Sequence, residues 1–164
     1  MQGYIDTPYF KLIHRMECVE RPKLRDGYRF IIPDEKTLSE HIASCYVSER
    51  VSAAKLAAYR LHATFDPDLW LAIVDEQRYR IVASGIAEVD RDIREGILEW
   101  IQVSQEYRQR GWGRIIVNEL LYRMRNIADF VTVSGKVNET SGPRALYESC
   151  GFEDAVIWHV IKVV

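Results

Sequence analysis

The stretch at residues 108–114, "RQRGWGR", places three arginines and two glycines around one tryptophan, between a strand-like run and a helix-like run. Backbone N–H groups in the first turn of a helix have no intrahelical partners, and the helix macrodipole adds partial positive charge there. Glycines at 111 and 113 would let an anion approach, because no Cβ stands in its way. The residues alone leave two interpretations, a phosphate-binding loop or a solvent-exposed arginine-rich turn.

Other site classes find little support in the sequence. The stretch is not a nucleotide P-loop, because no Lys-Ser or Lys-Thr follows its second glycine, and it is not GxGxxG. Three widely spaced cysteines and four histidines show no metal-ligand spacing, so we predict no metal. A net charge of −2 and a pI near 6.1 give no basic field for nucleic acid or membrane. We therefore expect a soluble, cytoplasmic protein with neither partner.

The elements that would position this loop follow from hydrophobic periodicity and turn residues. Strands are predicted at residues 9–19, 27–33, 69–75, 80–90, 96–103, 130–137 and 156–164. Helices are predicted at residues 35–47, 52–65, 113–127 and 143–149. The strands from 69 to 103 should form an antiparallel meander. With no repeat or linker in the chain, we expect a single domain over 1–164.

Two signatures in the second half of the chain resemble the GNAT superfamily of acyl-CoA-dependent N-acetyltransferases. The run "LEWIQVSQEYRQRGWGRIIVNELL" is similar to its acetyl-CoA motif, Q/R-x-x-G-x-G/A, which follows the fourth strand and opens the third helix. The run "VNETSGPRALYESCGF" is similar to its second signature, with Asn138, Tyr147 and the Gly-Phe at 151–152 in matching places. The resemblance is strongest over 95–152, weaker over 28–94, and does not cover an N-terminal extension at 1–27.

The resemblance implies an α/β fold of the α+β type. Its sheet would be mixed, mostly antiparallel and twisted, with splayed fourth and fifth strands flanked by about four helices. Acetyl-CoA would be the acyl donor, with no metal. Its pyrophosphate would lie on the loop before the third helix, and the backbone of Val103 would hydrogen-bond the acyl carbonyl. The implied cofactor-binding residues are Ile101, Val103, Arg108, Gln109, Arg110, Gly111, Trp112, Gly113, Arg114, Asn138 and Tyr147.

Two side chains are predicted to be catalytic. Tyr147 matches a position that often holds the acid, and a phenol with a pKa near 10 is close enough to a thiol near 8.5 to protonate a thiolate. The alternative for Tyr147 is a core aromatic residue on a short helix. Glu99 matches a position where several members carry a base that takes the amine proton, often through water. The alternative for Glu99 is a strand carboxylate facing solvent.

Three aromatic side chains also need an assignment. Trp112 either lies over the adenine or is exposed. Trp100 and Trp158 alternate with apolar strand residues, which predicts packing in the core or the pocket wall.

The predicted function is an N-acetyltransferase that moves acetyl from acetyl-CoA to a primary amine of a small molecule or a peptide. The amine would attack directly in a ternary complex. The alternatives are a non-catalytic acyl-CoA-binding regulatory module and a protein interaction domain. Only 12 residues follow Phe152, enough for one strand where most members have two. The acceptor side is therefore either open or completed by another subunit, so a homodimer is possible.

Overall fold

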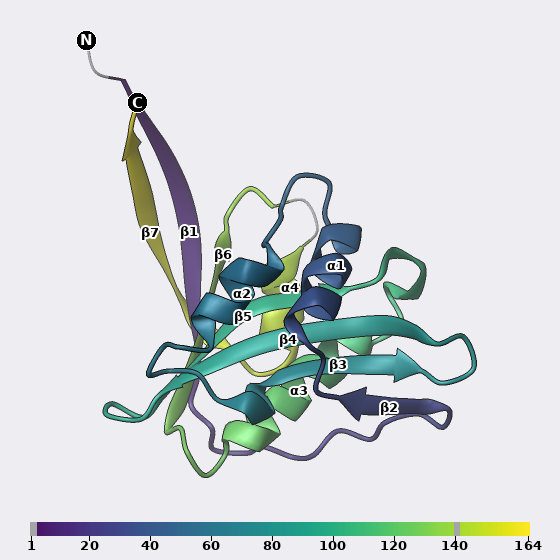
Figure 1. The fold of residues 1–164 in the computed structure, drawn as a ribbon. Helices are drawn as coiled ribbons and strands as arrows, with labels where there is room; N and C mark the ends of the chain where they lie inside the picture. Colours follow the sequence, from purple (N-terminus) through teal and green to yellow (C-terminus); the bar gives the residue numbers. More distant parts are fainter. Residues whose placement is uncertain (1–2, 140–141) are drawn as a thin grey trace.

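A seven-stranded sheet organises the chain, in the order β2-β3-β4-β5-β6-β1-β7 (Figure 1). The structure is a computed structural model that describes residues 3–139 and 142–164. The strands are β1 Tyr4–His14, β2 Tyr28–Ile31, β3 Trp70–Asp75, β4 Arg80–Asp90, β5 Glu95–Val103, β6 Phe130–Lys136 and β7 Glu153–Val163. The helices are α1 Glu35–Cys45, α2 Ala53–Tyr59, α3 Trp112–Met124 and α4 Pro143–Ser149, and 3₁₀ turns span Pro67–Leu69 and Gln105–Tyr107. The predicted fold class is confirmed.

Apolar stripes attach helices to both faces of the sheet. On one face, α3 buries the stripe that the sequence predicted, including Ile116, Leu120 and Met124, in the larger core cluster. On the other face, α1 and α2 pack Leu38 and Leu56 with other apolar residues in a second cluster. Each of these two helices begins at a side-chain cap, where Asp34 accepts from the N–H of Thr37 and Ser52 from that of Lys55.

The middle of the sheet has a bulge followed by a gap. Every neighbouring pair of strands is antiparallel except β5 and β6, which are parallel. Gly85 pairs with Ile101 and Ala87 with Leu98, so β5 contains one extra residue at positions 99–100. The ladder between β5 and β6 also ends at Leu98, opposite Val133. The predicted splay of these strands is thereby confirmed, and it begins at the bulge.

The N-terminal extension supplies a strand to the sheet. The strand predicted at 9–19 is β1, which starts earlier and lies between β6 and β7. The chain then passes α3, where Arg21 lies 3.7 Å from Glu119, before it enters β2. At the far end of the sheet, β1 and β7 extend together beyond the other strands (Figure 1). The single C-terminal strand that the sequence predicted is therefore paired along its length with the N-terminal one.

Candidate active site

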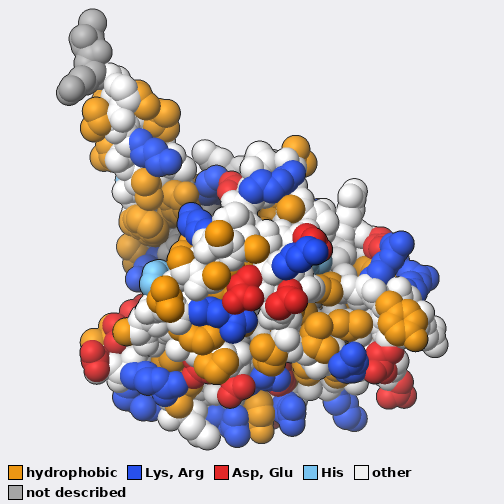
Figure 2. Space-filling model, viewed as in Figure 1, with side chains coloured by type: hydrophobic (Ala, Val, Ile, Leu, Met, Phe, Trp, Pro, Cys, Tyr) orange, Lys and Arg blue, Asp and Glu red, His pale blue; other side chains and the backbone are white. Residues whose placement is uncertain are grey.

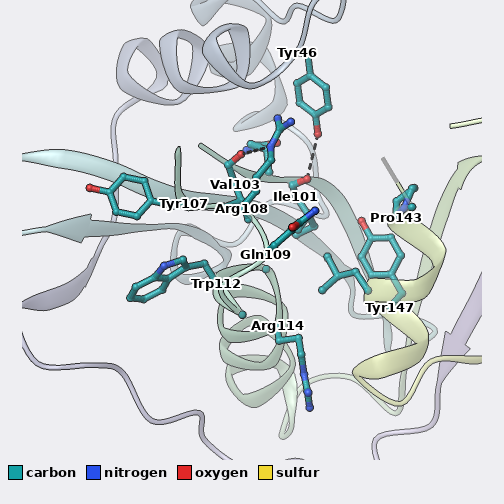
Figure 3. A pocket seen from close by; sticks show the side chains of 15 residues that line it. Tyr46, Ile101, Val103, Tyr107, Arg108, Gln109, Trp112, Arg114, Pro143 and Tyr147 are labelled. Carbon is teal, nitrogen blue, oxygen red and sulfur yellow. Dashed lines mark hydrogen bonds between the residues drawn. The ribbon is translucent and has the colours of Figure 1, made fainter. Parts of the chain in front are cut away.

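A cavity of about 470 Å³ lies where β5 and β6 separate (Figure 3). Its walls come from the end of β5, the loop before α3, the first turn of α3, the start of α4, and Tyr46 just after α1. The lining residues are Tyr46, Ile101, Gln102, Val103, Tyr107, Arg108, Gln109, Gly111, Trp112, Gly113, Arg114, Gly142, Pro143, Leu146 and Tyr147. Most of the predicted cofactor-binding residues are thus brought together, whereas Arg110, Asn138 and Glu99 are not part of this lining.

The edge of β5 that faces the cavity presents backbone polar groups. The N–H of Ser104 donates to Val82 on β4 at 2.8 Å, and the direction of backbone groups alternates along a strand. Residues 101 and 103 therefore face away from β4, toward the gap. Their carbonyls accept hydrogen bonds from side chains, from the Tyr46 hydroxyl at 3.1 Å and from Arg108 Nε at 3.1 Å (Figure 3). Since N–H and C=O of one residue share a direction, two N–H groups also point into the gap.

The N-terminus of α3 lies beside this edge. Gly111 caps the helix with φ of +85°, in the left-handed region, where a residue with a side chain loses roughly 1–2 kcal/mol of conformational energy. The N–H of Ile115 reaches the Gly111 carbonyl at 3.2 Å, which closes the first turn. The N–H groups of residues 112–114 precede that bond and have no intrahelical acceptor, so this end of the helix suits an anion.

Gly113 lines the cavity and also has a packing role. It is buried, and a Cβ placed on it would lie 3.1 Å from Leu146 Cδ2. The missing side chain therefore lets α4 pack closely on α3. That this glycine also makes room for a phosphate, as the sequence indicates, stays a prediction.

The three loop arginines have different environments. Arg108 lines the cavity, yet its guanidinium bonds the Val103 carbonyl and, at 2.7 Å, the Cys45 carbonyl, so it ties β5 to the end of α1. Arg110 is exposed, and its carbonyl accepts a hydrogen bond from Arg25 of the N-terminal extension. Arg114 is exposed and lines the cavity. In Figure 3, however, its guanidinium points away from Val103 and Gln109, along α3.

Trp112 and Asn138 differ in burial and in their position relative to the cavity. Trp112 is only 2% exposed and packs its ring 4.4 Å from that of Tyr28, with the Arg25 guanidinium 4.5 Å from its centroid. The alternative of an exposed ring is wrong, because Arg25 of the N-terminal extension and Tyr28 cover the indole, whereas a role beside the cofactor stays a prediction since Trp112 lines the cavity. Asn138 is exposed in the loop after β6, outside the cavity lining.

Tyr147 lies on α4 across the cavity from β5. Its side chain is buried, edge-on to Phe152 with ring centroids 5.8 Å apart, and its hydroxyl points toward the strand that carries Ile101 (Figure 3). Burial raises the pKa of its phenol, and the nearby Tyr46 raises it further. Burial likewise raises the pKa of Tyr46 to about 12. Both phenols therefore remain protonated donors at neutral pH.

Glu99 lies at the bulge, on the sheet face covered by α1 and α2. Its side chain keeps part of its surface in solvent, but the packing around the carboxyl removes enough water to raise its pKa to about 7. The charge of Glu88 on β4 adds to that rise. Glu88 in turn accepts a hydrogen bond from Thr64 at 3.0 Å. A carboxylate with a pKa near neutrality can accept and release a proton at working pH.

A buried chain of hydrogen bonds behind β5 was not predicted. Ser104 donates to the Ile81 carbonyl at 2.7 Å, so it accepts from His41 Nε2 at 2.9 Å. His41 Nδ1 then accepts from Ser84 at 2.7 Å, and Ser84 accepts from the Gln102 amide. Burial lowers the pKa of His41 to about 4, which agrees with a neutral ring. The chain fixes Gln102 and Ser104 on either side of Val103.

Tyr46 was also missed by sequence reasoning. It follows a helix whose amphipathic pattern gave no sign that the next side chain would reach β5, and its partner Ile101 is 55 residues away. Among residues 3–139 and 142–164 no group of three or more His, Cys, Asp or Glu side chains is arranged to hold a metal ion. Within that same part of the chain, every helix is too short or too polar to cross a bilayer.

The sequence also matches a known protein family. A family model for the acetyltransferase (GNAT) domain matches residues 66–154. A search of curated protein sequences finds no match.

Solved structures share the fold. A GCN5-related N-acetyltransferase from Sphaerobacter thermophilus superposes with a TM-score of 0.75 at 19% identity, covering 98% of this chain and 53% of that one. A tandem GNAT protein of the clavulanic acid biosynthesis pathway gives 0.67 at 14%, covering 98% and 55%. The ribosomal-protein-S18-alanine N-acetyltransferase from Escherichia coli gives 0.62 at 18%, covering 82% and 93%. The chain spans about half the length of the first two proteins.

Proposed function

The chain belongs to the GNAT acetyltransferase family, and from that premise we propose that it transfers acetyl from acetyl-CoA to a primary amine. The observation that carries the proposal is the open edge of β5, which faces the cavity beside the N-terminus of α3 and opposite Tyr147. A thioester is already activated, so the protein needs donors and a base rather than a nucleophile. The cavity supplies the donors, and Glu99 supplies the base.

The backbone would hold the acyl donor. The N–H groups of Ile101 and Val103 point into the gap, where the amide groups of a pantetheine arm and the acyl carbonyl find partners. The first turn of α3 would meet the pyrophosphate, and the exposed Arg114 side chain would have to turn from its position in Figure 3 to contact it. We assign Arg108 to the framework of the site, because two backbone carbonyls already occupy its guanidinium.

Proton transfer would involve two side chains. Glu99 takes the proton from the amine, directly or through water, since an alkyl ammonium with a pKa near 10.4 is almost fully protonated at neutral pH. The neutral amine nitrogen then bonds the acyl carbon, the carbon–sulfur bond breaks, and the nitrogen releases its second surplus proton to solvent. Tyr147 donates to the departing thiolate. Its raised pKa keeps the proton on the phenol, so we expect a strong hydrogen bond, with solvent completing the protonation.

The amine would approach from the face of the sheet covered by α1 and α2. Glu99 and Glu88 lie on that face and favour a cationic acceptor. A small-molecule amine and a peptide amine both fit this description, and the Escherichia coli relative acts on ribosomal protein S18 alanine. The nature of the acceptor therefore has to come from a screen.

The test measures CoA release from acetyl-CoA across small amines, polyamines, amino acids and peptides, together with the melting temperature. A rise in melting temperature with acetyl-CoA shows binding to the folded state. Release that depends on an amine and falls in Tyr147→Phe supports the proposal. Binding without release for any amine favours the non-catalytic acyl-CoA-binding module, and no binding at all rejects both.

A further inference from the structure

The β1–β7 ribbon, formed by residues 4–8 and 159–163, projects from the body of the protein (Figure 1). Lys136 at the end of β6 pairs with Tyr9, so β6 stops where the ribbon begins. From that point outward β1 and β7 have only each other as strand neighbours among the described residues. A two-stranded ribbon with no further packing is at best marginally stable in water.

Apolar side chains are exposed along the ribbon and its base, and Figure 2 shows those on the side facing the viewer. The partners in an antiparallel pair share a face, so Ile5 and Val156 lie on one side and Tyr4 and Ile161 on the other. Their exposed fractions are 52%, 62%, 72% and 63%. The sequence predicts that Trp158 packs in the core or the pocket wall, and this is wrong, because its side chain is 41% exposed with its ring packed against that of Tyr9. Several exposed apolar side chains gathered on one projecting element point to an interaction surface.

The free edge of β7 is a second, independent feature. The N–H of Val164 donates to Gly3 at 3.0 Å, so residue 164 faces β1, and the pairing is regular from Val156 to Val163. Alternation then turns residues 157, 159, 161 and 163 outward. The hydrogen bond from the Val137 N–H to the Pro8 carbonyl supports this direction. Pro8 pairs with His159, and because its carbonyl points away from β7, the backbone groups of His159 point away from β1. Natural edge strands are usually short, charged or covered, and this one is long and largely apolar.

We propose that β7 pairs antiparallel with β7 of a second copy of this chain, about a two-fold axis, so that the sheets of both copies become continuous. The charges on the strand favour this direction. Glu153 and Asp154 at its start already pair with Arg15, which leaves Lys162 at its end as the charge that decides, and antiparallel pairing separates the two Lys162 side chains whereas parallel pairing would align them. Pairing centred on His159 sets Ile157 against Ile161 of the second copy.

The proposal is tested by sedimentation equilibrium over a wide range of protein concentration. The wild type should be a dimer, and Ile161→Pro should weaken dimerisation by about tenfold or more, because proline removes an N–H that faces outward and leaves the bonds to β1 intact. Ile161→Thr keeps that N–H and the β-branched shape, so it should remain dimeric. Circular dichroism and melting temperature check that each variant folds.

A second variant covers the case in which Ile161→Pro does not fold. Lys162→Glu places an acidic group near Asp154 of the second copy and should weaken the dimer most at low salt. A wild type that is monomeric at every concentration overturns the proposal. A dimer that survives Ile161→Pro but not Trp158→Lys also overturns it, because the contact would then lie on the face of the ribbon. A monomer that binds phosphatidylcholine vesicles overturns it as well.

Discussion

Two strand edges in this molecule are left open, and their surroundings differ. The edge of β5 is open only from Glu99 to Val103, it borders a cavity, and side chains of Tyr46 and Arg108 already bond its carbonyls. The edge of β7 runs along a projecting strand with apolar side chains on both faces. The exposed backbone groups are the same in both cases. Because the surroundings differ, we propose different partners, an acyl donor in the cavity for β5 and a second strand for β7.

The largest effect on stability should come from protonation of His41, because its hydrogen bonds to Ser84 and Ser104 help to hold β5 in place. His41 is neutral in the folded chain, with its pKa lowered to about 4 by burial, whereas an unfolded histidine has a pKa near 6.5. As the pH falls, the unfolded state therefore binds a proton at a higher pH than the folded state does. The free energy of unfolding is thus unaffected by this group above about pH 6.5 and decreases as the pH drops toward 4. We expect a loss of up to about 3 kcal/mol from this group.

Urea unfolding from pH 7 to pH 4 measures that loss, with His41→Gln as the control. Glutamine can accept from Ser84 and donate to Ser104 without titrating, so its stability should depend less on pH over this range. Equal slopes for the two proteins would mean that other groups, not His41, cause acid sensitivity. No equivalent test exists for β7, because among the described residues no buried chain of hydrogen bonds lies behind that strand.

The next effect concerns the donor opposite the open edge of β5. Tyr147→Phe keeps the ring against Phe152 and removes only the hydroxyl. Turnover should fall by about 10², equivalent to about 2.7 kcal/mol in the barrier, while the Kd for acetyl-CoA changes little. Steady-state kinetics and calorimetric titration measure the two quantities. Undiminished turnover would return Tyr147 to the role of a core aromatic residue.

A smaller effect, with a distinctive pH profile, should follow Glu99→Gln. Activity of the wild type should rise with pH through about 7 as the carboxyl ionises. The variant should be about tenfold slower near neutral pH, and the deficit should shrink at higher pH as free amine becomes abundant in solution. A pH-independent deficit would instead assign Glu99 to acceptor binding.

Stability gives a second readout for the same variant. The folded-state pKa of Glu99 is raised above the unfolded value, so ionisation of this group opposes folding once the pH exceeds the unfolded pKa. Glu99→Gln should therefore be more stable than wild type at pH 8, and the difference should vanish as the pH falls below 4. Loss of activity joined to a gain in stability is not expected for an ordinary solvated carboxylate.

Local features of this molecule could be predicted from the sequence, and long-range contacts could not. The glycine before α3, the helical stripe of α3 and the start of α4 at Pro143 depend on neighbouring residues, and each lies where the pattern indicated. The contact of Tyr46 with Ile101 spans 55 residues and that of Arg25 with Arg110 spans 85. No periodicity encodes such pairs. The burial of Trp112 could not be predicted for the same reason, because the segment that covers its indole lies far before it in the chain, around Arg25.

The smallest effect separates backbone strain from ligand binding. Gly111 has φ of +85° at the N-terminus of α3, and Gly27 has φ of +81° in a turn before β2. A Cβ added at Gly27 would meet nothing within 4 Å, and one added at Gly111 would meet only Arg25 Nη2, at 3.7 Å. Alanine at either site is therefore free of collisions but must adopt the same left-handed conformation, so each variant should lose about 1 kcal/mol of folding stability.

Only Gly111→Ala should also weaken acetyl-CoA binding, by roughly threefold, because relaxing the strain tilts the first-turn N–H groups away from the anion. Melting curves and calorimetric titrations of both variants decide the point, with Gly27→Ala as the matched control for strain alone. If Gly27→Ala weakens acetyl-CoA binding as much, the loss reflects general destabilisation, and the open end of α3 beside β5 does not hold the pyrophosphate.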